Sequence, residues 1–177
     1  MARRTEVLLL LILTIAATAF ADEEKPLSDV FDQQLNVSAG HYRAKGMCPF
    51  GWMIYGKRCF RYQATSMNWD SAEKHCQNLS GHLVSIQNEN EYRLVKFLIG
   101  VQELNEKPTW IGLSSCRQIF KWAWSDDTQL TFTKWNFGEP NHLLGECCVN
   151  INSGINKDWS DMNCKMKYPF VCAKELD

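Results

Sequence analysis

The chain has 177 residues, 8 of which are cysteine, and its formal net charge is −1. A charge so close to zero does not suggest the basic patch that binds nucleic acid or an anionic membrane. The length favours one domain with enough residues for a hydrophobic core.

Residues 1–21 have the pattern of a secretory signal peptide. A basic start precedes an apolar run from Val7 to Ala17, and Ala19-Phe20-Ala21 resembles a cleavage site. The apolar run is too short to span a bilayer comfortably, and no other stretch of the sequence reaches the length of a transmembrane helix. We therefore expect a secreted, soluble mature protein that begins near Asp22.

The cysteines predict disulfide bridges. An even number of cysteines in a secreted chain of this size favours four bridges over a metal or redox site. The C-x-x-C spacing of zinc ribbons and thioredoxin-like proteins does not occur in the sequence. Eight cysteines allow about a hundred pairings, and the sequence itself does not choose among them.

Residues 22–47 are polar and contain no cysteine. They include the glycosylation sequon Asn36-Val37-Ser38, which predicts an exposed segment. A few apolar residues recur at helical spacing, but one or two helical turns are not stable alone in water. The segment is a flexible leader, a short propeptide or a small oligomerisation helix, and we favour the leader because no heptad pattern is sustained.

Residues 48–175 form the predicted domain, which is rich in aromatic and turn residues. Its first part reads as a hairpin that a Cys48–Cys59 bridge would close. Two amphipathic helices are expected next, the first from an Asn68 cap to Gly81 and the second from an Asn88 cap to Gly100.

Short strands are expected after the helices, and the order of elements predicts an α+β domain with helices packed on an antiparallel sheet. Glu91 is the expected capping-box partner of Asn88. The long connection from Ser125 to Glu146 hangs off this sheet, and a loop of that length in a compact domain is usually functional. The expected strands are 109–113, 120–124, 148–151 and 168–172.

Oxygen-bearing side chains gather between Glu139 and Asp161. Carboxylates, amides and hydroxyls are the ligands of hard cations such as calcium. Pro140 lies between Glu139 and Asn141, and its fixed φ would aim both side chains to one side of a turn. Taken alone, the pattern also fits an ordinary polar surface loop.

Other candidate residues have simpler interpretations. His75 and His82 fit surface or helix-end positions better than ligand or base positions. The sequence contains no G-x-S-x-G, H-E-x-x-H or P-loop motif, so it does not predict an enzyme. The tryptophans are expected in the core, at positions 110, 122, 124 and 159.

Several separate motifs together resemble the C-type lectin-like domain. They are Trp110-Ile111-Gly112-Leu113, Trp124-Ser125-Asp126, Gly138-Glu139-Pro140-Asn141 and Trp159-x-Asp161, with cysteines in a matching order. The resemblance extends from Cys48 to Cys172 and is closest to the single-domain secreted fish lectins and type II antifreeze proteins. It implies a disulfide-stapled fold in which two helices pack on antiparallel sheets beside a long calcium-binding loop. The pairing it implies is Cys48–Cys59, Cys76–Cys172, Cys116–Cys147 and Cys148–Cys164.

The resemblance also implies a calcium site that binds carbohydrate. Its expected ligands are Glu139, Asn141, Glu146 and Asp161. Ser160 stands where the family usually has asparagine, and its shorter side chain reaches less far and lacks an amide donor.

The family mechanism is coordination of two vicinal sugar hydroxyls, with no catalysis. The order Glu-Pro-Asn resembles members that prefer mannose, fucose or N-acetylglucosamine, and His142 is a candidate wall beside the sugar. Because the carboxylate ligands must be ionised, binding is expected to weaken as the pH falls. A single shallow sugar site is weak, so a homo-oligomer is expected if avidity matters.

Two alternatives use the same scaffold. An ice-binding protein similar to the type II antifreezes would need a flat, regular face, for which Thr131 and Thr133 on a strand are candidates. A calcium-free protein-binding domain would fit the loss of asparagine at Ser160. A second sequon at Asn78 is a further candidate for glycosylation.

Overall fold

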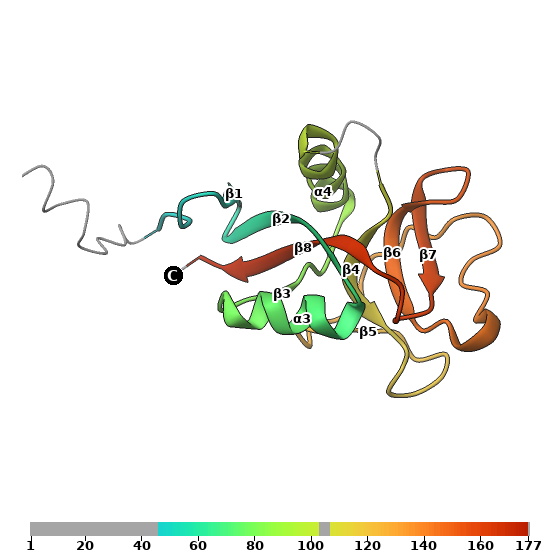
Figure 1. The fold of residues 1–177 in the computed structure, drawn as a ribbon. Helices are drawn as coiled ribbons and strands as arrows, with labels where there is room; N and C mark the ends of the chain where they lie inside the picture. The colour runs from blue at the N-terminus through green and yellow to red at the C-terminus, as the bar shows by residue number, and fades with distance from the viewer. Residues whose placement is uncertain (1–45, 103–106, 177) are drawn as a thin grey trace, which may run out of the picture. The chain divides into compact units, whose positions relative to one another are not determined.

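The computed structural model describes residues 46–102 and 107–176 of the chain (Figure 1). The expected signal peptide, nearly all of the 22–47 segment and the sequon at Asn36 lie outside these residues. Among the described residues, no helix is long and apolar enough to cross a membrane. In chain order the elements are β1 (Met53–Tyr55), β2 (Arg58–Met67), α3 (Trp69–Asn78), β3 (His82–Leu83), α4 (Glu89–Gln102), β4 (Thr109–Ser114), β5 (Ala123–Trp124), η1 (Leu143–Gly145), β6 (Cys148–Ser153), β7 (Asp158–Met162) and β8 (Tyr168–Glu175).

The fold is α+β, as the sequence predicted. The main path through the sheet is β1-β2-β8-β4-β6-β7, with β3 paired to β8 and β5 to β4. Helices α3 and α4 lie on opposite sides of the β2–β8 ribbon (Figure 1). The sheet is mixed instead of purely antiparallel, because β4 runs parallel to β8 where Trp110 pairs with Phe170.

Helix α3 begins at the expected cap. The Asn68 side chain accepts a hydrogen bond from the Ser71 backbone N–H at 2.9 Å. The left-handed residue that ends the helix is Ser80, with a φ of 60°, and the expected Gly81 has a different role. A Cβ on Gly81 would lie 2.5 Å from the Ala173 carbonyl oxygen, so this glycine lets the chain pass close to β8. Asn78, the sequon residue, is exposed at the last position of α3.

Helix α4 begins at the predicted cap but differs from the prediction in its capping box and in its C-terminal end. Asn88 caps it, accepting hydrogen bonds from the backbone N–H groups of Asn90 and Glu91 at 3.0 Å. The Glu91 carboxylate accepts from the Gln87 backbone N–H at 2.9 Å, one residue before the partner that a capping box requires. The helix also continues through Gly100 to Gln102, because an isolated glycine weakens a helix without always ending it.

The strand predictions hold best for β4, β6 and β8. The strand expected at 120–124 shrinks to β5, because Phe120 has a left-handed φ of 65° that a strand does not allow. Strand β7 was not predicted, since its sequence Asp-Trp-Ser-Asp-Met alternates poorly, yet three of its five residues are buried. The expected strand at Thr131 and Thr133 does not form, so that prediction is wrong.

All eight cysteines form the bridges that the family resemblance implied. The pairs are Cys48–Cys59, Cys76–Cys172, Cys116–Cys147 and Cys148–Cys164. The core contains Trp110, Trp124 and Trp159, each at most 2% exposed. Trp122 is only partly buried, so the prediction that it belongs to the core is wrong.

Gly112 and Gly100 offer a matched test of the packing around β4. A Cβ on Gly112 would lie 2.5 Å from the Leu83 carbonyl oxygen, whereas a Cβ on Gly100 meets no atom within 4 Å. Gly112→Ala should lower the free energy of unfolding by about 1–3 kcal/mol because backbone must move. Gly100→Ala should raise it by about 0.5–1 kcal/mol through helix propensity. Urea denaturation measures both, and equal effects of the two substitutions would contradict the packing of β3 on β4.

Candidate functional site

The carboxylate of Asp161 attaches the long loop to the sheet. Asp161 lies in β7 opposite Val149 of β6, and its side chain is fully buried. Its Oδ1 accepts a hydrogen bond from the Asn141 backbone N–H at 2.9 Å, and its Oδ2 accepts one from the His142 backbone N–H at 2.8 Å. These two bonds fix the loop at the point where the expected cation ligands lie.

Glu139 and Asn141 are held on the same turn. The peptide bond between Glu139 and Pro140 is cis. The Asn141 side-chain amide donates to Glu139 Oε1 at 3.0 Å, and the Asn141 Oδ1 accepts from the Leu143 backbone N–H at 2.9 Å. The second carboxylate oxygen of Glu139, Oε2, is buried and has no hydrogen-bond donor among the described residues. A buried carboxylate oxygen without a donor is costly unless a cation or a proton is bound there.

The negative charges of Glu139, Glu146 and Asp161 act on one another. Burial, followed by the hydrogen bond and the charge of Asp161, raises the pKa of the Glu139 carboxyl from 4.5 to about 7. Burial and the Asp161 charge also raise the pKa of Glu146. The site therefore gathers carboxylates whose charge its described protein surroundings do not neutralise, which makes it a candidate for cation binding.

Ser160 faces away from these carboxylates. Successive residues of a strand point to opposite faces, and Ser160 directly precedes Asp161 in β7. Its hydroxyl accepts a hydrogen bond from the Asn136 side-chain amide at 2.9 Å. The same amide donates to the Ser153 carbonyl oxygen at 2.8 Å. Ser160 thus helps to hold the side chain of Asn136, a residue of the long loop, and so helps to attach that loop to the sheet.

An aromatic cluster adjoins the acidic residues. The His142 Nδ1 lies 3.6 Å from Asp161 Oδ2. The His142 ring stacks on Trp122, with centroids 5.2 Å apart, and meets Phe120 edge-on at 4.4 Å. The expected sugar-side residue His142 is therefore packed between two aromatic rings that the sequence did not associate with the site.

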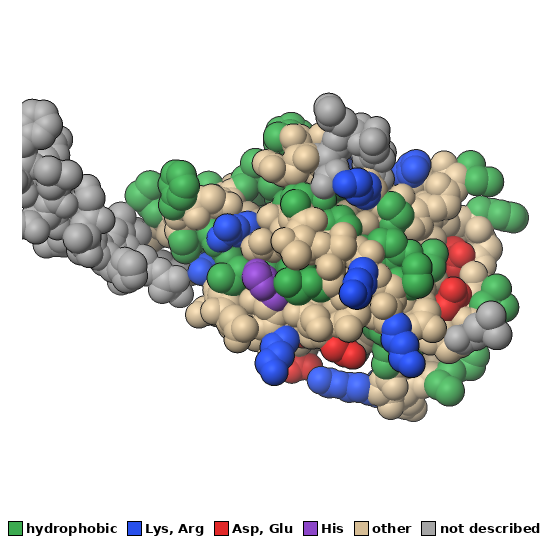
Figure 2. Space-filling model, viewed as in Figure 1, with side chains coloured by type: hydrophobic (Ala, Val, Ile, Leu, Met, Phe, Trp, Pro, Cys, Tyr) green, Lys and Arg blue, Asp and Glu red, His purple; other side chains and the backbone are tan. Residues whose placement is uncertain are grey.

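The surface around the site mixes acidic and apolar side chains. Figure 2 shows acidic side chains among hydrophobic ones at the end of the molecule that carries β6 and β7. Loops of this region expose Phe137 and Ile155 completely, and Leu143 is 61% exposed. Exposed apolar groups of this kind commonly mark a binding surface.

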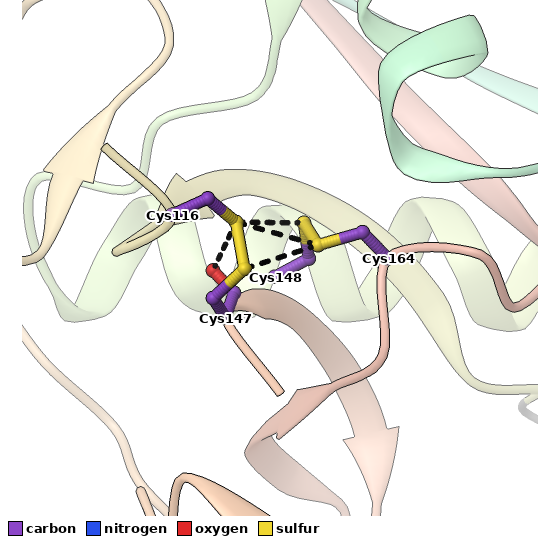
Figure 3. A group of neighbouring side chains, drawn as sticks. All are labelled: Cys116, Cys147, Cys148 and Cys164. Carbon is purple, nitrogen blue, oxygen red and sulfur yellow. Dashed lines mark hydrogen bonds between the residues drawn. A yellow bond between two sulfur atoms is a disulfide. The ribbon is translucent and has the colours of Figure 1, made fainter. Parts of the chain in front are cut away.

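Two neighbouring disulfides lie where the long loop ends, directly after Glu146. Cys116–Cys147 and Cys148–Cys164 place their four sulfur atoms within 4.8 Å of one another (Figure 3). A Cys116 sulfur to Cys164 sulfur distance of 3.4 Å separates the two bridges. Because every sulfur is in a disulfide, the cluster has no thiolate to bind a metal. The bridges fix the C-terminal end of the segment that carries Glu146, since Cys147 and Cys148 follow it directly.

The remaining candidates lie apart from the site. His82 Nδ1 is 2.6 Å from a Glu73 carboxylate oxygen, and His75 contacts the Phe170 ring edge-on, so both histidines have structural contacts. Asp158, in the same acidic stretch as Asp161, accepts a hydrogen bond from the Tyr92 hydroxyl on α4. Asn136 was missed because a lone asparagine in a long loop carries no sequence signal of its burial.

Comparison with known proteins agrees with this geometry. The family model of the Lectin C-type domain matches residues 65–174. A type-2 ice-structuring protein of Brachyopsis segaliensis is 33% identical over 167 residues, covering 93% of this chain and 95% of that protein. The galactose-specific lectin nattectin of Thalassophryne nattereri is 36% identical over 135 residues, covering 76% of this chain and 84% of that protein.

Solved structures agree as well. The crystal structure of a calcium-independent type II antifreeze protein covers 74% of this chain and 96% of its own, with a TM-score of 0.68 and 35% identity. The relatives named here are lectins and ice-structuring proteins, so the family is non-enzymatic. The chain therefore belongs to the C-type lectin-like family, in the group that contains fish lectins and type II antifreeze proteins.

Proposed function

We propose that the protein is a secreted, calcium-dependent lectin whose ion and sugar bind at Glu139, Asn141, Glu146 and Asp161. The observation that carries this proposal is the buried Glu139 Oε2, which lacks a donor among the described residues beside the negative charge of Asp161. A divalent cation would offset both the burial and the Asp161 charge that raise the pKa values of Glu139 and Glu146.

The donor set fits calcium in type. Carboxylate and amide oxygens are the ligands that calcium prefers. Calcium would supply open coordination positions for two vicinal hydroxyls of a sugar. Glu139 and Glu146 accept hydrogen bonds from those hydroxyls, and the Asn141 amide donates one to a sugar oxygen. Ser160 is the weakest candidate ligand, because its hydroxyl is occupied by Asn136.

The sugar class follows from the Glu-Pro-Asn order, which favours mannose-type glycans. A relative named as galactose-specific argues for testing galactose in parallel. The signal-peptide pattern of residues 1–21 supports secretion. Recognition of microbial or host glycans is the role that this combination suits, with avidity from a homo-oligomer.

Ice binding is the second candidate function. The type-2 ice-structuring relative matches 93% of this chain, against 76% for the galactose-specific lectin. The threonines expected to face ice do not favour it, because the Thr131 hydroxyl donates to the Gln87 carbonyl oxygen at 3.2 Å outside any strand. Shaping of ice crystals by the protein at micromolar concentration, without retention on sugar resins, would select this function over the lectin. A calcium-free protein-binding role is the remaining alternative.

Removal of one ligand charge should weaken sugar binding. Mature protein should be retained on mannose resin in millimolar calcium and released by a chelator. Glu139→Gln should lower the affinity at least about tenfold, because it removes a charged ligand. Asp127→Asn is the matched control, since Asp127 is an 86% exposed carboxylate in the same long loop. Equal retention of both variants would contradict the assignment of Glu139.

The raised pKa of Glu139 makes stability depend on pH in a defined direction. Its folded-state pKa of about 7 exceeds its ordinary value of 4.5, so in a chelator the ionised form destabilises the fold above pH 7 and the penalty disappears below pH 4.5. Glu139→Gln should therefore raise the melting temperature at pH 8 and leave it nearly unchanged at pH 5.

Calcium should reverse this dependence. Protons compete with the ion for Glu139, so the rise in melting temperature caused by saturating calcium should shrink as the pH falls from 8 to 6. Calorimetric melting of the natural sequence, with calcium and with chelator at each pH, measures this rise in melting temperature. A calcium effect of the same size at both pH values would show that Glu139 is not a ligand.

A further inference from the structure

We propose that Phe120 and His142 form an aromatic ledge beside the ion site, which binds an apolar or aromatic group attached to the coordinated sugar. The inference rests on the proposed lectin function, because it concerns the same site and names the glycoside class that the site prefers. That class is a glycoside with an apolar aglycone, as opposed to a free sugar or a methyl glycoside.

The ledge is the outer end of a row of aromatic rings. The row starts in the core at Trp159 and continues through Trp135, at a centroid distance of 5.9 Å, to Trp122, at 4.9 Å. Trp122 stacks on the His142 ring at a centroid distance of 5.2 Å. The Phe120 ring meets the His142 ring edge-on at a centroid distance of 4.4 Å. Each ring packs against the next one in the row, so a chain of contacts that begins in the core supports the outermost ring, Phe120.

The backbone at both ledge residues is in an unusual conformation. Phe120 has a φ of 65° and His142 a φ of 51°, both in the left-handed region that bulky residues rarely occupy. Such conformations persist only where the surroundings enforce them, and they cluster at binding sites. For His142 the enforcing contacts are the backbone and ring interactions with Asp161.

The Phe120 and His142 rings differ in their exposure to solvent. The Phe120 side chain belongs to a residue that is 74% exposed, whereas the His142 side chain is 15% exposed. An aromatic ring that is held in place yet left in water gains most from covering by another apolar group. His142 is therefore the support and Phe120 the contact surface.

The position of the ledge indicates which part of a ligand would cover it. His142 contacts both Asp161 and Phe120, so one ring separates the exposed Phe120 ring from the buried carboxylate. A sugar coordinated at Asp161 is polar and fills the acidic part of the site. The group attached to that sugar is the part that extends outward, and an apolar group there would meet Phe120.

The test compares two glycosides of one sugar. Phenyl and methyl glycosides of mannose, or of galactose if that resin retains the protein, compete for release of bound protein in calcium. The phenyl glycoside should be about three- to tenfold more potent on the natural sequence. Phe120→Ala should remove this difference and leave the potency of the methyl glycoside unchanged. Phe50→Ala is the control, because Phe50 is a fully exposed phenylalanine beside β1 at the other end of the domain.

The outcomes separate the ledge from the lectin function. Equal potency of the two glycosides on the natural sequence, or a phenyl preference that survives in Phe120→Ala, would overturn the ledge and leave the lectin function standing. A change of oligomeric state in Phe120→Ala with an unaltered phenyl preference would assign Phe120 to contact with a second copy, which also overturns it. Retention on neither resin would overturn the lectin function, and the ledge with it.

Discussion

The functional end of the molecule depends on two hydrogen bonds that the buried carboxylate of Asp161 accepts from backbone N–H groups. It joins a long loop that has almost no regular structure to strand β7, which is part of the sheet. Charge-assisted bonds to backbone are strong when they are shielded from water. Together with the hydrogen bond from the Asn136 backbone N–H to the Trp159 carbonyl oxygen at 2.8 Å, they hold the turn that carries Glu139 and Asn141 against the sheet.

The same interaction creates an electrostatic problem that a cation would solve. Asp161 accepts both bonds, and its charge adds to burial in raising the pKa values of Glu139 and Glu146. The disulfides at Cys147 and Cys148 prevent the segment after Glu146 from moving far away. The loop is thus held in an arrangement that concentrates negative charge, and we interpret that concentration as the binding site itself.

The sequence predicted features that depend on local chemistry. Asn68 and Asn88 cap their helices because a capping side chain needs only backbone groups two or three residues away. Features that depend on distant contacts were missed or misplaced. Strand β7 forms because Trp159 and Asp161 are buried by partners far along the chain.

The candidate site also contains residues that the local sequence predicted and residues whose role depends on distant contacts. The Glu-Pro-Asn motif located Glu139 and Asn141, whereas the support provided by Asn136 and the exposure of Phe120 depend on how separate loops pack together. Trp122 was assigned to the core by composition, yet it packs against His142 at the edge of the site. A tryptophan near a predicted binding loop has two roles that its sequence position alone does not distinguish.

Titration of calcium into the mature, oxidised protein by isothermal calorimetry at pH 7.5 shows whether Glu139 is a calcium ligand. We expect saturable binding that Glu139→Gln removes and Asp127→Asn leaves intact. An absence of binding heat together with an unchanged melting temperature at millimolar calcium would contradict it, and the concentrated negative charge around Asp161 would then need another partner.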